Sequence, residues 1–134
     1  AGITIKPVLV EWLTKKGFAI TDFGTDSPGP VDYSDFAHRV AELVESGEYD
    51  LGVLICGSGQ GASLAANKHQ GIRAALCWIP EIARLARSHN DANILCLPGR
   101  FVDSDTALAI LEKFFTTPFE GGRHQRRIEK IPFR

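Results

Sequence analysis

The stretch LGVLICGSGQG, residues 51–61, decides the fold of this chain. Its first half, Leu51 to Cys56, is a short apolar run of the kind that forms a buried strand. The three glycines that follow interrupt regular structure, and the alanine-rich run from Ala62 to Asn67 comes directly after them. A strand that leads through a Gly-rich turn toward a helix N-terminus is typical of α/β proteins with a parallel sheet.

Outward from this stretch, helical and strand-like patterns alternate. Apolar residues at helical spacing predict a helix from Ile5 that ends at Gly17, and three more helices. These three run from Phe36 to Val44, from Pro80 onward, and from Asp103 to Phe115. The other predicted strands are 18–23, 72–76 and 94–97, with a loop at 24–30. The prediction is a Rossmann-like three-layer α/β/α sandwich with a mainly parallel sheet.

Composition narrows the class of protein. The 134 residues fit one domain, 1–134, and the apolar (44%) and charged (23%) fractions are ordinary for a globular protein. A net charge of −1 gives no reason to expect nucleic acid or an anionic membrane as a partner. No apolar run is long enough for a membrane span, and no signal peptide is recognisable.

Three cysteines without a C-x-x-C pair argue against a disulfide framework and against a zinc site, so we expect a cytoplasmic protein without a metal. Cys56 differs from Cys77 and Cys96 because it stands where a strand meets the Gly-rich turn. A thiol near a helix N-terminus can have a lowered pKa and act as a base or nucleophile. The backbone N–H groups of the turn could hold an anion or an enediolate. For Cys77 and Cys96 we expect the ordinary role of buried structural thiols.

Two further groups could take part in the chemistry. His89 and Asn90 follow a predicted helix, and an imidazole suits proton transfer to a sugar oxygen, although a loop histidine is more often a solvated cap. Arg123 and Arg127 are spaced to share a helical face and could hold a phosphate together. The alternative for these arginines is a solvated basic tail.

Five segments together resemble the ribose-5-phosphate isomerase B family, in the family's order and over nearly the whole chain. They are Ile55–Gly61, Ala65–Lys68, Gly71–Ala74, His89–Asn93 and Glu120–His124, with Asp32–Ala37 resembling the substrate-side loop. The resemblance implies a cofactor-free interconversion of D-ribose 5-phosphate and D-ribulose 5-phosphate. It also implies a homodimer with active sites between the subunits.

By position in the family, Cys56 resembles the base, His89 the ring-opening residue, and Ser58 stands in the catalytic turn. Substrate contacts are implied for the remaining residues of the turn, for Tyr33, Asn90 and Arg100, and for the two arginines of the phosphate clamp. In full, the implied contacts are Gly57, Gly59, Gln60, Gly61, Tyr33, Asn90, Arg100, Arg123 and Arg127. No metal or cofactor is implied. Relatives with a glutamate base carry it where this chain has Ala62, which indicates the cysteine subtype.

The chain departs from the family at its start, because family members open with a strand that ends in Asp-His-Ala-Gly and this chain opens at Ala1-Gly2. We therefore expect that a first strand belongs before Ala1. Gln60 also replaces an aliphatic residue of the family. Two other functions stay open: isomerisation of a six-carbon sugar phosphate, allose or galactose 6-phosphate, and a non-catalytic sugar-phosphate-binding module.

Overall fold

The computed structural model describes residues 5–23 and 32–133. Three strands and six helices are found in these ranges. They follow the order α1 (Lys6–Lys15), α2 (Tyr33–Glu45), β1 (Gly52–Cys56), α3 (Gln60–Ala66), β2 (Ala74–Leu76), α4 (Pro80–Asn90), β3 (Ile94–Pro98), α5 (Ser104–Thr116) and α6 (Arg123–Ile128). From β1 to α5, strands and helices alternate, as the sequence predicts.

The strand β3 is the centre of the sheet. It pairs in parallel with β1 on one side and β2 on the other, and Gly52 and Cys56 of β1 stand opposite Ile94 and Pro98 of β3. All five residues of β3 are buried, as expected for a parallel strand covered on both faces.

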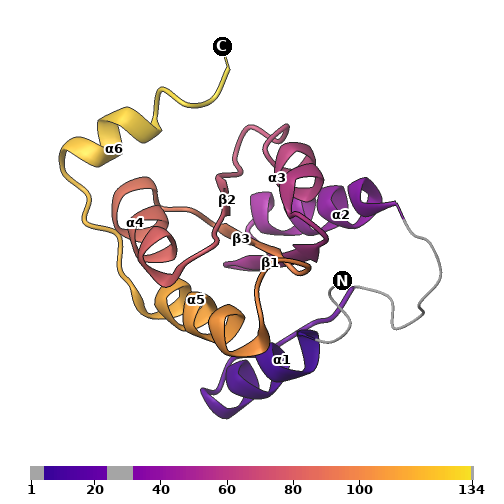
Figure 1. Cartoon of the computed structure of the whole chain (residues 1–134). Helices are drawn as coiled ribbons and strands as arrows, with labels where there is room; N and C mark the ends of the chain where they lie inside the picture. Colours follow the sequence, from indigo (N-terminus) through magenta and orange to yellow (C-terminus); the bar gives the residue numbers. More distant parts are fainter. Residues whose placement is uncertain (1–4, 24–31, 134) are drawn as a thin grey trace.

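Helices cover both faces of the sheet, so the three-layer α/β/α prediction is confirmed. In Figure 1, α1, α4 and α5 lie on one side of the sheet and α2 and α3 on the other. Successive side chains of a strand point to opposite faces, and β3 shows this directly: Leu95 and Leu97 join the core under α4 and α5, whereas Ile94 and Cys96 join the core under α2 and α3.

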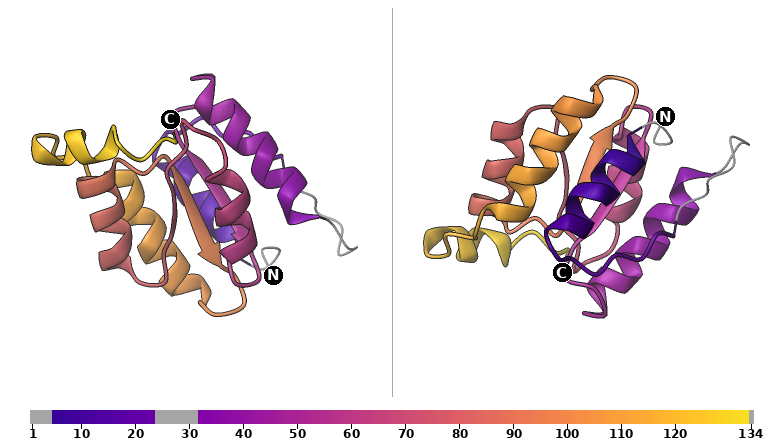
Figure 2. Two further views of the ribbon diagram at one scale, coloured as in Figure 1. Left: turned by 90° about the horizontal axis from the view of Figure 1, so that it is seen from above. Right: turned by 90° about the horizontal axis from the view of Figure 1, so that it is seen from below.

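The helix α6 stands apart from these layers. It contacts α4 and projects from the body of the molecule, as both views of Figure 2 show. Beyond it, the chain returns, and the side-chain amide of Gln70 exchanges two hydrogen bonds with the backbone of Phe133, of 2.8 and 3.0 Å. Within the described ranges, no helix is long and apolar enough to cross a membrane.

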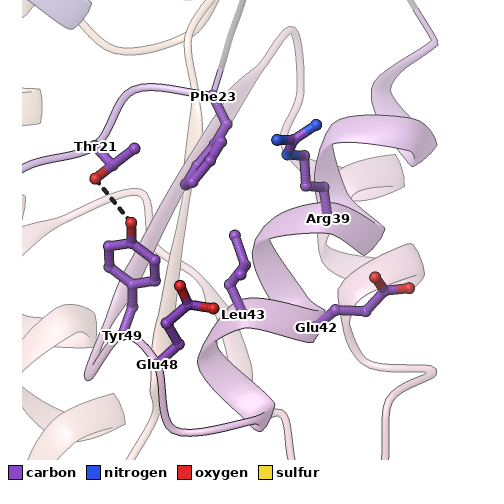
Figure 3. A pocket seen from close by; sticks show the side chains of 7 residues that line it. All are labelled: Thr21, Phe23, Arg39, Glu42, Leu43, Glu48 and Tyr49. Atoms are coloured by element: carbon purple, nitrogen blue, oxygen red, sulfur yellow. Dashed lines mark hydrogen bonds between the residues drawn. The ribbon is translucent and has the colours of Figure 1, made fainter.

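The prediction of a strand at Phe18–Phe23 is wrong, because these residues pair with no strand in the described part of the chain. Side-chain contacts hold the segment instead: Thr21 and Tyr49 share a hydrogen bond of 2.9 Å, and the rings of Phe23 and Tyr49 meet edge to face. A pocket of about 520 Å³ lies between the segment and α2, with Arg39 and Leu43 on its helical side (Figure 3). The loop predicted at 24–30 lies outside the described residues.

The backbone lies close against the sheet at Gly59, which precedes α3. Its φ of +76° lies in the left-handed region, and an added Cβ would come within 2.4 Å of Leu76 Cδ1 and 3.3 Å of the Leu97 backbone. A side chain here would therefore be disfavoured both by the backbone conformation and by lack of space. Gly17 has a φ of +90° but open space around it, so it shares only the first constraint.

We therefore expect Gly59→Ala to lower the free energy of unfolding by more than Gly17→Ala does. The left-handed conformation should cost either variant about 1–2 kcal/mol, and overpacking should add about 1–3 kcal/mol at Gly59 alone. Urea titration of both variants measures the difference. Equal losses would show that the contact with β2 and β3 relaxes without cost.

Candidate active site

The base proposed from the sequence stands at the carboxyl edge of the sheet. Cys56 is the last residue of β1, and its carbonyl accepts a hydrogen bond of 2.8 Å from the Gly99 N–H just after β3. A second bond, from the Arg100 N–H to the Gly57 carbonyl at 3.0 Å, continues this link. The link fixes the ends of β1 and β3 together, so Cys56 and Arg100 meet at one edge.

The turn after Cys56 joins the strand to α3. Ser58 is exposed, and its Oγ accepts a hydrogen bond of 3.2 Å from the Gln60 N–H. The N–H groups of a first helical turn have no partner within the helix, and they point toward its N-terminus. At the start of α3 they face the carboxyl edge, where they could stabilise negative charge on a substrate oxygen.

Two glycines of the turn make room for neighbouring side chains. A Cβ at Gly61 would lie 2.4 Å from the ring of Tyr33, and a Cβ at Gly57 would lie 3.4 Å from Arg100. Both side chains therefore rest on the turn, one from the start of α2 and one from the loop after β3. We call Cys56, the turn 57–61, Tyr33 and Arg100 the thiol half-site.

The three cysteines have different surroundings. Cys56 is half-buried, while Cys77 and Cys96 are buried, and all three are free thiols. Burial raises the pKa of Cys77 and of Cys96 to about 12, because the thiolate would lose its hydration. Both thiols therefore stay protonated near neutral pH, in keeping with the structural role expected from the sequence.

The other predicted site residues lie around the end of α4. His89 is half-buried, Asn90 is exposed, and the ring of His89 stacks on the ring of His124 from α6, with centroids 4.4 Å apart. Arg123 and Arg127 are exposed on α6 and pair with none of the described residues. We call these five residues the histidine half-site.

The two half-sites lie at opposite edges of the sheet within one chain. Cys56 ends β1 at the carboxyl edge, whereas α4 runs back along the sheet and delivers His89 just before β3 begins at Ile94. Five paired residues separate these edges, which is about 13 Å at about 3.3 Å per residue. A single copy of the chain thus brings Cys56 together with Tyr33 and Arg100 but not with His89.

The sequence-based interpretation assigned no role to Glu120 or to the His124 side chain. The Glu120 carboxylate lies 3.5 Å from His124 Nε2 and 4.0 Å from His89 Nε2. Glu120 and His124 are four residues apart, a spacing that would place them on one helical face. The chain bends between Glu120 and His124, however. Their spacing in the sequence therefore does not predict that both side chains lie beside His89.

Comparison with known proteins extends this picture. Residues 1–131 match the family model described as Ribose/Galactose Isomerase. The chain is 44% identical to ribose-5-phosphate isomerase B of Escherichia coli K12 over 97% of its own length and 87% of that relative.

Solved structures agree closely with the fold. A ribose 5-phosphate isomerase of Thermotoga maritima superimposes with a TM-score of 0.94 at 51% identity, covering 98% of this chain and 91% of that one. Ribose-5-phosphate isomerase B of Mycoplasma genitalium, solved with bound ribulose-5-phosphate, gives 0.92 at 46% identity, with coverage of 97% and 87%. The chain belongs to the ribose/galactose isomerase family and, within it, to the ribose-5-phosphate isomerase B group.

Proposed function

We propose that this protein interconverts D-ribose 5-phosphate and D-ribulose 5-phosphate by moving a proton between two carbons, with Cys56 as the base. The observation that carries the proposal is the thiol half-site, in a chain of this family. Cys56 is the free thiol that lies half-buried beside the turn, whereas burial holds Cys77 and Cys96 protonated. The turn offers backbone N–H donors next to this thiol, of which the Gln60 N–H already donates to Ser58 Oγ.

The reaction follows from this geometry. The Cys56 thiolate takes the proton from the carbon next to the aldehyde, and the electron pair of that C–H bond forms an enediolate. The N–H groups at the start of α3 stabilise the oxygen that becomes negative, and Ser58 and Gln60 border the same place. Within the enediolate, the hydroxyl proton on the second carbon moves to the oxygen of the first carbon, and Cys56 returns its proton to the first carbon, which gives the ketose. Atoms and electrons balance without a cofactor.

The histidine half-site supplies the remaining steps. Ribose 5-phosphate is mostly cyclic, so its ring must open before the carbon acid is exposed, and His89 can move a proton between the ring oxygen and the anomeric hydroxyl. Asn90 is exposed beside it and can hold a hydroxyl. Arg123 and Arg127 are exposed cations suited to the phosphate.

A homodimer would bring the two half-sites together around one substrate. One chain holds them at opposite edges of the sheet, so one substrate can meet both only if a second copy brings its histidine half-site to the thiol half-site of the first. The projecting α6 is suited to such a reach (Figure 2). Two-fold symmetry would then give each dimer two equivalent sites.

The three cysteines are free thiols, which suit a reducing compartment, and we place the enzyme in the cytoplasm.

A six-carbon sugar phosphate is the second candidate substrate, because the matching family includes galactose isomerases. Assays of ribose, allose and galactose phosphates, each with a coupled readout of the ketose product, would rank the three compounds by kcat/KM. A chain that binds these compounds without converting any would be a sugar-phosphate-binding module.

The shared site can be tested with a hybrid dimer. Cys56→Ala and His89→Ala chains carrying different affinity tags are co-expressed, and the hybrid is isolated. If sites are shared, one site of the hybrid carries both changes and the other carries none, so activity toward the cyclic aldose should be about half that of the wild-type dimer. Each variant homodimer should be far less active. A hybrid no more active than its parents would show that each chain acts alone.

Cys56 and His89 should also fail in different ways. Cys56→Ala removes the base and should stop isomerisation in both directions, together with exchange of the substrate carbon proton into deuterated water. His89→Ala should slow the aldose direction about 10²- to 10⁴-fold and largely spare the ketose, which cannot form a ring through its phosphorylated oxygen. Persistent carbon-proton exchange in Cys56→Ala would mean that another group is the base.

Arg127→Ala should chiefly raise KM, because the phosphate takes no part in the proton transfer. A charge-assisted hydrogen bond contributes about 1.5–3 kcal/mol, which corresponds to about 10- to 150-fold in affinity. Inhibition by inorganic phosphate should weaken in parallel. Arg126 is also exposed on α6 and serves as the control, since Arg126→Ala should change neither quantity. The same behaviour of both variants would assign Arg127 to a solvated tail.

A further inference from the structure

Three potential metal ligands converge beside α4. His89, Glu120 and His124 each offer one ligand atom, and these atoms all lie within 4.8 Å of one another. The carboxylate-to-imidazole distances of 3.5 and 4.0 Å are longer than an ordinary hydrogen bond. Zinc bonds of about 2.0–2.2 Å place tetrahedral ligands about 3.3–3.6 Å apart, so the carboxylate already lies near coordination spacing from both imidazoles.

We propose that His89, Glu120 and His124 form a binding site for a divalent first-row transition metal such as Zn²⁺. Two imidazoles and one carboxylate are ligands that Zn²⁺ takes in proteins, and three protein ligands leave one position open to water or to another ligand. Cysteine spacing, on which the expectation of no zinc site rests, carries no information on histidine and glutamate ligands. The ligands come instead from the end of α4, the loop after α5 and the start of α6.

The backbone holds the three ligands in place. The Glu120 N–H donates a hydrogen bond of 3.0 Å to the Ser88 carbonyl, which fixes the loop against the end of α4. Gly121 and Gly122 then turn the chain with positive φ values of 73° and 60°. This turn places His124 back beside Glu120. The His124 side chain is only 10% exposed, so one ligand is largely ordered before a metal binds.

Binding requires one ring to tilt. A metal lies in the plane of each imidazole that binds it, whereas the His89 and His124 rings stack within 10° of parallel. The His89 side chain is 39% exposed and can turn toward the shared position, while His124 stays packed. The exposed arginines of α6 add positive charge beside the site, which solvent and salt screen in part.

A second group of two histidines and a glutamate makes a natural control. His38 Nδ1 and His69 Nε2 share a hydrogen bond of 2.8 Å, and His69 Nδ1 lies 3.5 Å from Glu45. There the two facing ring nitrogens already satisfy each other, so neither offers a free lone pair to a metal. Metal binding should therefore distinguish the two groups.

The test measures Zn²⁺ binding directly. Full-length protein stripped with EDTA should take up one Zn²⁺ per chain in competition with a chromophoric chelator, and Co²⁺ should give the visible bands of a four-coordinate ion. Glu120→Gln and His124→Asn should each weaken binding at least about 10-fold, the lower end of what even an outer-shell partner contributes. His69→Asn should bind as the wild type does. Circular dichroism checks that every variant is folded.

Two results would overturn the proposal: no saturable uptake of Zn²⁺ by the wild type, or uptake that Glu120→Gln and His124→Asn leave unchanged.

The metal site would also affect catalysis, and this consequence rests on the proposed function. Bound Zn²⁺ would occupy the lone pair of His89, so it should inhibit the aldose direction more than the ketose direction, and EDTA should reverse this. The binding measurements stand even if the isomerase assay fails, so the two ideas can be refuted separately.

Discussion

The parallel direction of the three strands is the constraint on which the rest of this structure depends. A parallel strand can follow another only after the chain has returned across the sheet, and here helices make each return. Every such helix therefore begins at the carboxyl edge and ends at the amino edge. The turn after β1 and the loop after β3 meet at the first edge, and the end of α4 lies at the second. The positions of the two half-sites follow from chain direction.

The turn 57–61 shows how packing against a parallel sheet restricts the residues that a turn can contain. A side chain at position 59 would collide with β2 and β3, a side chain at 61 would collide with the Tyr33 ring, and a Cβ at 57 would touch Arg100. Glycine at 59 lets the chain enter α3 close against the sheet. Glycines at 57 and 61 leave the surface of the turn open to its neighbours. The same residues thus satisfy the packing of the fold and keep the space beside Cys56 accessible.

The helices and strands that the sequence predicted correctly are those whose patterns involve only neighbouring residues. The periodic apolar residues of α1 and α5, the uninterrupted apolar run of β1 and the glycines after it depend on residues close in sequence. The segment 18–23 has the composition of a strand, but a strand needs a partner for its backbone groups, and the contacts of this segment are instead with side chains such as those of Tyr49 and Phe115. A single sequence contains no local signal for such a partner.

The candidate site likewise has one part that the sequence could predict and one part that it could not. Cys56 and the turn could be placed from the sequence because a strand end and a Gly-rich turn are adjacent along the chain. The grouping of His89 with Glu120 and His124 could not, since it depends on how α6 returns to α4 across a bend at Gly121 and Gly122. Family resemblance supplied roles for residues on both half-sites. It gave no distance between them, and the topology provides that distance.

The stacking of His124 on His89 connects the two roles of the histidine half-site. A helix of six residues is marginal alone, and within α6 only His124 and Ile128 are buried. Contact with α4 therefore sets the direction in which α6 projects, and the stacked rings form part of that contact. Arg123 and Arg127 take their positions from this helix. The residue proposed to open the ring thus also helps to orient the helix proposed to hold the phosphate. A change that moves either ring should therefore affect phosphate binding as well as ring opening, and in His89→Ala this part of the effect would appear as a higher KM in both directions.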